Sequence, residues 1–201
     1  MRGVIAYLAG ISIAAGVLTA DVAVAADEKG EFGIRGAGLV TCSIYTRERE
    51  ARSQIYYIIA AWMDGYITGA NEHADDTYDI VSFESAELLG ALVNENCKKH
   101  PQASVFVVLR AILQKSAENR LTAPSKKVEV AIGDRKVFLY EEVLKRAQQK
   151  LASAGFYKGP ITAEYDARTQ EAIKAFQSSI GLEPTGFPDQ LTLWRLFNRE
   201  S

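Results

Sequence analysis

The stretch GPITAEYDARTQEAIKAFQSSIGLEPTG, residues 159–186, decides the fold of the C-terminal part of the chain. Its apolar residues recur at helical spacing and predict a helix from roughly Asp166 to Ser179, with Asp166 suited to the N-cap position. Gly181 and Gly186 supply turns that residues with a Cβ would strain. Because it combines turns, acidic groups and a glutamine beside a helix, the stretch suits either a catalytic site or a small binding module.

Two further helices are predicted on either side of this stretch. The first ends at Gly155, where a glycine cap is favoured, and its apolar stripe consists of Leu139, Val143, Leu144, Ala147 and Leu151. The other runs from about Asp189 to Asn198. The result is a three-helix unit of about 60 residues, a size that folds alone but only marginally. Just before it, VEVAIGDRKVFLY gives a weak signal for two short strands around Gly133.

The spacing of residues across this unit follows one pattern: A-Q-x-x-L-x-x-x-G-F-Y, then I-x-x-x-Y-x-x-x-T-x-x-A-I-x-x-F-Q, then G-L-x-x-T-G-x-x-D-x-x-T-L-x-x-L. The pattern resembles the peptidoglycan-binding domain 1 family of three-helix modules. It is carried by Gln148, Leu151, Gly155, Tyr157, Ile161, Tyr165, Thr169, Ala172, Phe176, Gln177, Gly181, Leu182, Thr185, Gly186, Asp189, Thr192 and Leu193. Most of these positions are expected to serve the core, the turns or the helix starts.

The resemblance implies a module that holds the cell wall without cutting it. Wall contacts are then expected on an exposed rim that consists of Tyr157, Lys158, Gly159, Tyr165, Arg168 and Gln177. Aromatic faces pack on sugar rings or on stem-peptide methyl groups. The guanidinium of Arg168 suits a peptide carboxylate through charge-assisted hydrogen bonds.

One turn departs from the family pattern. The family usually carries Asp-Gly before the tyrosine or phenylalanine and a glycine just after it, whereas this chain has Thr162-Ala163 and Asp166. The loss of two glycines changes the backbone options of a tight turn. We therefore expect the departure to affect ligand affinity more than the fold.

No catalytic residue, metal site or cofactor is predicted. The chain has only two histidines, His73 and His100, and they lie in separate segments, so a zinc ligand set is not expected. Cys97 precedes His100 by three residues, but no recognisable nucleophile block surrounds it. The chain is therefore interpreted as a protein that is not an enzyme.

The N-terminus predicts export. Arg2 is followed by an apolar run and then by the A-x-A signal at Ala23 to Ala25, so residues 1–25 are interpreted as a secretory signal peptide. A retained membrane anchor is the alternative, although the run is short for a spanning helix. The expected location is the periplasm, with no stable membrane insertion after cleavage, and residues 26–38 are expected to be a flexible lead-in.

Cys42 and Cys97 form an even pair in the exported chain and predict a disulfide, with free or metal-bound thiols as the alternative. Apolar residues recur at helical spacing across 39–118 and predict a disulfide-bonded helical domain. Residues 119–137 are expected to be a linker, and 138–201 the wall-binding module. The predicted fold class is thus all-α, a helical domain followed by a three-helix module.

The helical domain resembles the HdeA/HdeB group of periplasmic acid-stress chaperones. The residues that carry this resemblance are Cys42, Trp62, Cys97, Lys98, Lys99, Pro101 and Ala103. It implies loosening at low pH and exposure of apolar surface to unfolding clients. A family of helical immunity proteins shares the GY-x-x-G segment and the His-Pro helix start, and it competes with this interpretation.

The formal net charge of −2 gives no basic footprint, so nucleic acid is not an expected partner. Taken together, the sequence predicts an exported, non-enzymatic protein that binds peptidoglycan, either its glycan or its stem peptide, and positions the helical domain at the wall. The alternative is an accessory or inhibitory subunit that regulates a wall hydrolase or an envelope machine. Envelope proteins are possible further partners under both interpretations.

Overall fold

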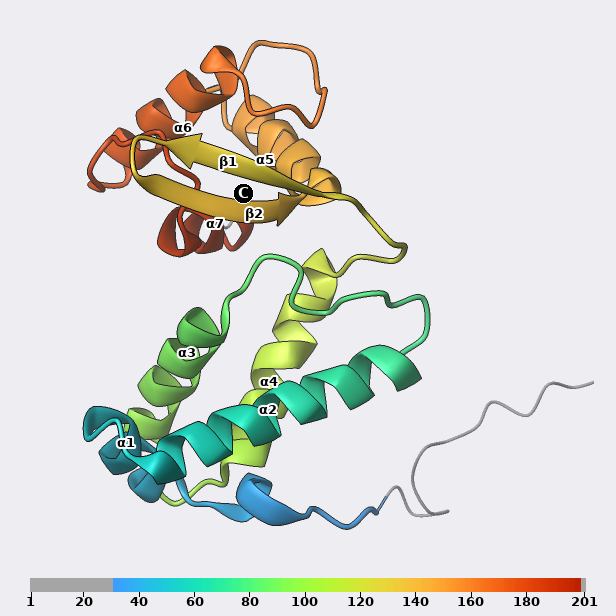
Figure 1. Cartoon of the computed structure of the whole chain (residues 1–201), viewed down its shortest axis with the longest axis vertical. Helices are drawn as coiled ribbons and strands as arrows, with labels where there is room; N and C mark the ends of the chain where they lie inside the picture. Colours follow the sequence, from blue (N-terminus) through green and yellow to red (C-terminus); the bar gives the residue numbers. More distant parts are fainter. Residues whose placement is uncertain (1–30, 200–201) are drawn as a thin grey trace, which may run out of the picture. The chain divides into compact units, whose positions relative to one another are not determined.

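A computed structural model describes residues 31–199 (Figure 1). The predicted signal peptide, residues 1–25, lies outside the described residues. The α-helices of the described part are α1 (Cys42–Glu50), α2 (Gln54–His73), α3 (Ala86–Lys99), α4 (Val105–Ser116), α5 (Glu141–Ser153), α6 (Ala167–Ser179) and α7 (Gln190–Phe197). Two short 3-10 helices, η1 (Gly36–Leu39) and η2 (Ala117–Asn119), accompany them.

The fold is mostly helical, as predicted, but it is not strictly all-α, because the chain also forms an antiparallel hairpin. Strand β1 (Lys127–Ile132) pairs with β2 (Arg135–Tyr140), and Val130 lies opposite Val137. Alternation of apolar and polar residues favours strands here, and Gly133 adopts a φ of 57° at the turn. Part of the predicted linker 119–137 is therefore β1.

The disulfide between Cys42 and Cys97 is confirmed and joins the start of α1 to the end of α3. Both cysteines are buried in a core that α1 to α4 share. Serines begin three of the four helices: the side chains of Ser53, Ser85 and Ser104 each accept a hydrogen bond from the backbone N–H three residues further on. Local capping and one covalent link thus fix this helical region.

The end of the predicted lead-in packs against α2. Gly36 and Gly38 lie beside the indole of Trp62, and a Cβ built on Gly38 would come within 2.4 Å of that ring. Trp62 in turn stacks on Tyr66 at a centroid distance of 5.5 Å. Glycine at position 38 is therefore required by the close approach of the backbone to an aromatic ring.

A second core gathers α5, α6, α7 and the hairpin. Val130 of β1 and Leu139 of β2 are buried with Leu144 and Leu151 of α5 and Phe176 of α6. The hairpin thus contributes apolar side chains to the core of the C-terminal helices.

None of the helices within residues 31–199 combines the length and the apolar character that crossing a membrane requires.

Removal of the disulfide is expected to destabilise the helical region strongly. The bridge closes a loop with a sequence separation of 55 residues, and chain-entropy arithmetic gives about 4 kcal/mol for such a loop. Cys97→Ser should lower the urea midpoint, measured by circular dichroism, and added reductant should lower the midpoint of the unmodified protein but not of the variant. An unchanged midpoint would show that the fold does not depend on the bridge.

A buried carboxylate sits between two segments of the helical region. Glu84 Oε1 accepts a hydrogen bond from the Ser116 hydroxyl at 3.0 Å, and Oε2 accepts one from the Phe83 backbone N–H at 3.3 Å. Burial raises the pKa of Glu84 above its usual value despite these bonds. A raised carboxyl pKa stabilises the fold below the unfolded pKa, and that contribution is lost as pH rises through the folded pKa.

Glu84→Gln is therefore expected to raise the thermal midpoint at pH 7, where the charged carboxylate is costly, and to raise it less as pH approaches 4. Scanning calorimetry across this range measures the difference. The exposed Glu118→Gln serves as the matched control and should show no such pH-dependent gain. An equal change in the thermal midpoint of Glu84→Gln at pH 7 and near pH 4 would contradict the raised pKa of Glu84.

Candidate functional site

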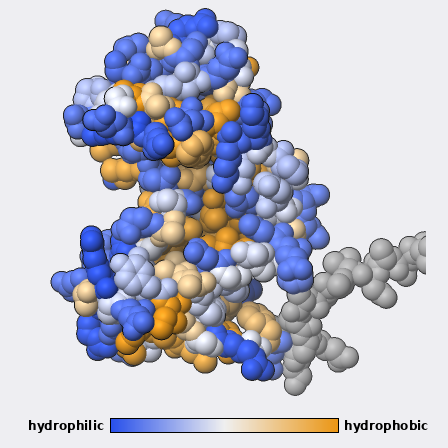
Figure 2. All heavy atoms as spheres, in the orientation of Figure 1, coloured by the Kyte–Doolittle hydropathy of each residue, from blue (hydrophilic) through white to orange (hydrophobic). Residues whose placement is uncertain are grey.

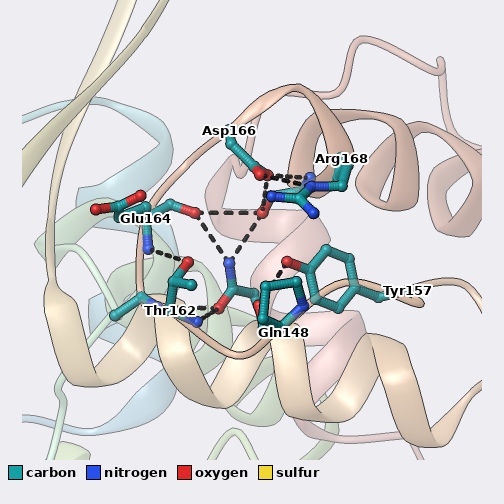
Figure 3. Close-up of polar contacts among 9 residues, drawn as sticks. Gln148, Tyr157, Thr162, Glu164, Asp166 and Arg168 are labelled. Carbon is teal, nitrogen blue, oxygen red and sulfur yellow. Dashed lines mark hydrogen bonds and ion pairs between the residues drawn. The ribbon is translucent and has the colours of Figure 1, made fainter.

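One side-chain amide fixes the loop that the family resemblance singled out (Figure 3). Gln148 of α5 is fully buried, and its Oε1 accepts hydrogen bonds from the backbone N–H groups of Thr162 and Ala163, both at 3.0 Å. Its Nε2 donates to the Glu164 carbonyl oxygen and to the Thr169 hydroxyl oxygen, both at 2.9 Å. A single helical residue thus satisfies the backbone of the loop and the start of α6.

The start of α6 is closed by an aspartate cap. Asp166 Oδ1 accepts from the Thr169 backbone N–H at 2.8 Å and lies 2.9 Å from the Thr169 hydroxyl, which makes the position an N-cap as predicted. Arg168 Nε donates to Asp166 Oδ2 at 2.9 Å. The hydrogen bond from the Thr169 backbone is the main reason why the pKa of Asp166 lies below its usual value.

The turn that departs from the family pattern keeps a left-handed residue. Ala163, which stands where the family usually has glycine, adopts a φ of 62°. Alanine tolerates this region at a cost that glycine avoids, and the two hydrogen bonds to Gln148 hold the turn in place. Asp166 has a φ of −98°, so no glycine is needed at that position. This turn therefore places a left-handed residue at position 163 without a glycine.

A second buried glutamine, on α6, bonds the backbone of the next loop in the same way. Gln177 of α6 is buried, its Oε1 accepts from the Gly186 N–H at 2.8 Å, and its Nε2 donates to the Phe187 carbonyl at 3.0 Å and to the Thr192 hydroxyl at 2.9 Å. Asp189 caps α7 by accepting from the Thr192 N–H at 2.8 Å. Each glutamine thus anchors the loop that follows its own helix and the threonine that begins the next.

Two of the six predicted rim residues do not lie on the surface. Tyr157 is 4% exposed, and Gln177 is 1% exposed. Tyr157 donates its hydroxyl to the Pro160 carbonyl at 2.8 Å, and its ring approaches Gly159 so closely that a Cβ there would lie 2.6 Å from the hydroxyl. The prediction that these two side chains are exposed is wrong, because their polar ends bond backbone groups of the neighbouring loops instead of meeting solvent.

The other four rim residues remain accessible to different degrees. Lys158 and Arg168 are exposed, while Gly159 and Tyr165 are partly buried. Tyr165 donates its hydroxyl to the carbonyl oxygen of Gly186 and so ties the two glutamine-anchored loops together. Burial raises the pKa of this hydroxyl, which stays protonated at neutral pH. The ligand contacts proposed for all six residues stay predictions.

A cleft of about 570 Å³ lies between β1 and the loop 162–165. Val128 to Ala131 form one wall and Thr162 to Tyr165 the other, so that of the predicted rim only Tyr165 reaches it. Three acidic residues, Glu129, Glu141 and Glu164, are among those that line the cleft, and no lysine or arginine lines it, although Lys126 pairs with Glu141 at 3.9 Å. Such a site suits a ligand that carries a protonated amine, together with N–H groups that can donate hydrogen bonds to carbonyl oxygens of the cleft.

Within residues 31–199, no group of three His, Cys, Asp or Glu side chains is placed to hold a metal ion.

Replacement of Gln148 is expected to unfold the loop and weaken the module. Gln148→Leu would leave several buried donors and acceptors without partners, at roughly 1–3 kcal/mol for each group that finds no water. Chemical denaturation should show a loss of more than about 3 kcal/mol in the free energy of unfolding. The neighbouring Gln149→Leu, on the exposed face of α5, is the matched control and should change it by less than about 0.5 kcal/mol. Equal losses in both variants would contradict the role of the buried amide.

The comparisons with known proteins agree with this geometry. A family model described as "Putative peptidoglycan binding domain" matches residues 141–196, which extend from the start of α5 to the last turn of α7. No curated protein and no solved structure matches the chain. The family match supports the identification of residues 141–196 as a peptidoglycan-binding domain.

Proposed function

We propose that this protein is exported, has no enzymatic activity of its own, and binds peptidoglycan through residues 141–196 so that its helical region is held at the cell wall. The observation that carries the proposal is the family match over α5 to α7, the same residues whose loops are fixed by Gln148 and Gln177. Periplasmic location rests on the sequence pattern of residues 1–25. Tethering raises the concentration of the helical region near the wall even when the contact is weak.

The cleft between β1 and the loop 162–165 is the proposed wall-contact site. Its acidic residues Glu129 and Glu164 match the amino group of a diamino acid in a stem peptide, because an ammonium group binds carboxylates through charge-assisted hydrogen bonds. The ring of Tyr165 offers an apolar face beside them. Lys158 and Arg168, exposed near the same loop, suit the carboxylates of the same peptide.

The helical region presents apolar side chains that suit a protein partner. Ile55, Tyr57 and Ile58 are exposed on the first half of α2, and Figure 2 shows hydrophobic atoms gathered there. Isolated apolar residues at a surface are ordinary, whereas neighbours on one helix favour a contact surface. This surface supports the second function considered, an accessory or inhibitory subunit that binds a wall hydrolase or another envelope protein.

For a chaperone role at low pH, as the HdeA/HdeB resemblance implies, one structural feature is favourable and another is unfavourable. The exposed apolar side chains of α2 are what client binding requires. The raised pKa of Glu84 acts in the opposite direction, because its protonation stabilises the fold as pH falls. Protection of unrelated clients from aggregation at low pH would favour the chaperone, and co-purification with one wall enzyme would favour the accessory subunit.

Wall binding is tested by co-sedimentation of the full-length chain with purified sacculi. We expect the protein to pellet, and the double variant Glu129→Arg, Glu164→Arg to pellet roughly fivefold less, since two exposed charge contacts contribute roughly 0.2–1 kcal/mol each and are replaced by repulsion. Glu183→Arg places the same charge on an exposed loop of the module outside the cleft and is the matched control.

Absence of the unmodified chain from the pellet would overturn the proposed function. Pelleting that the double variant leaves unchanged would retain wall binding but move the contact away from the cleft. Release of soluble muropeptides by the purified chain would contradict the absence of enzymatic activity.

A further inference from the structure

A groove of about 760 Å³ lies in the helical region and not in the module. Residues of α1, the first half of α2, and α3 line it. This volume is within the range that small-molecule sites occupy, roughly 300–1,000 Å³. The wall-contact site proposed above does not include any of its residues.

A partly buried cation forms one part of this groove. The side chain of Arg49 is only 17% exposed, and its Nη1 donates to the Tyr56 hydroxyl at 2.8 Å while its carbon Cζ lies 5.5 Å from the centre of the Tyr56 ring. Gly90 makes room for this arrangement, because a Cβ there would lie 3.0 Å from the Tyr56 hydroxyl and 3.2 Å from Arg49 Nη1. The guanidinium is therefore held in a fixed position.

The only carboxylate that pairs with this guanidinium among the described residues comes from the surface. Arg49 Nη2 donates to Glu87 Oε1 at 2.6 Å, yet the side chain of Glu87 is 77% exposed. An exposed carboxylate pays rotamer entropy to stay on a fixed guanidinium, and such pairs contribute little. A carboxylate from a ligand can take the place of Glu87, after which Glu87 returns to solvent.

The charge of the groove also favours an acidic ligand. Three cations line it, Arg49, Arg52 and Lys98, against two carboxylates, Glu50 and Glu87, although the chain as a whole has a formal net charge of −2. Among residues 31–199, Arg52 makes no ion pair. One cation of the groove is thus available without displacing any partner.

Two residues of the groove each carry a buried polar atom without a hydrogen-bond partner among the described residues. Thr46 Oγ1 and Asn94 Oδ1 are the buried side-chain oxygen or nitrogen atoms within residues 31–199 that have no hydrogen-bond partner, and both residues line this groove. Buried polar atoms without partners are rare in native proteins and call for an explanation such as an absent ligand. A peptide N–H is a suitable donor for the Asn94 oxygen, which accepts hydrogen bonds.

We propose that this groove binds a short peptide through its free carboxylate, with Arg49 and Arg52 on the carboxylate, Asn94 and Thr46 on the peptide amide, and the exposed ring of Tyr57 against an apolar side chain. The source to which we assign it is the stem peptide of peptidoglycan, and this assignment rests on the proposed function, since the module would hold the groove among such peptides. The helical region would then contribute a second, carboxylate-specific wall contact.

The test uses the full-length chain and a purified disaccharide tetrapeptide released from sacculi by a muramidase, followed by residue-resolved NMR. We expect saturable shifts of the Asn94 side-chain amide and of the Arg49 guanidinium, and loss of these shifts when the carboxylates of the peptide are amidated. Glu87→Gln should tighten binding several-fold because it removes the internal competitor, and Arg52→Gln should weaken it roughly two- to fivefold. Arg47→Gln, on α1 but outside the groove, is the control and should leave affinity unchanged.

Several results would overturn the proposal. They are the absence of shifts at Asn94 and Arg49 at millimolar ligand, equal binding of the amidated peptide, and binding of an acetylated alanine tripeptide with a free carboxylate when the wall peptide does not bind. Failure of the proposed function is separate, because it would appear as loss of sacculus pelleting and absence of shifts at Ala163 and Tyr165. The Glu129→Arg, Glu164→Arg variant keeps the two sites distinct, since it alters the module cleft and leaves the groove intact.

Discussion

The C-terminal module depends on two buried side-chain amides. Gln148 and Gln177 each project from a helix into the loop that follows, and each satisfies backbone groups that would otherwise be buried without partners. Inside a protein such hydrogen bonds are strong, and an unmade one is correspondingly costly. The helix starts at Asp166 and Asp189, the left-handed turn at Ala163 and one wall of the cleft all follow from these two amides.

The helical region is organised by a different constraint. The disulfide fixes the end of α3 beside the start of α1, and from there the facing residues of the two helices lie together: Tyr45 donates to the Gly90 carbonyl at 2.9 Å, and Arg49 meets Glu87. The same alignment places Thr46 and Asn94 in one groove. A covalent link that stabilises the fold thereby also positions the polar groups to which we assign peptide binding.

Local signals predicted the helices, the aspartate cap of α6 and the disulfide, because each depends on residues a few positions apart or on a single pair. The hairpin was visible in VEVAIGDRKVFLY, but its apolar alternation is short and was outweighed by the surrounding helical periodicity. Tyr157 and Gln177 were misplaced on the surface because a polar side chain does not reveal from sequence whether its partner is water or backbone. The cleft and the groove could not be predicted, since they bring together β1 with residues 162–165, and α1 with α3, through tertiary packing.

The anchoring of each loop to the helix before it also determines how the module can move. Loops at protein surfaces usually open independently of the core, at little cost in free energy. Here the N–H groups of Thr162, Ala163 and Gly186 are bonded to side chains whose own backbone is helical and buried. These loops cannot open without the exposure of an amide from the core, so their fluctuations belong to the cooperative unfolding of the module. A ligand in the cleft would therefore meet a surface that is already ordered, and its binding would not have to supply the entropy of ordering a loop.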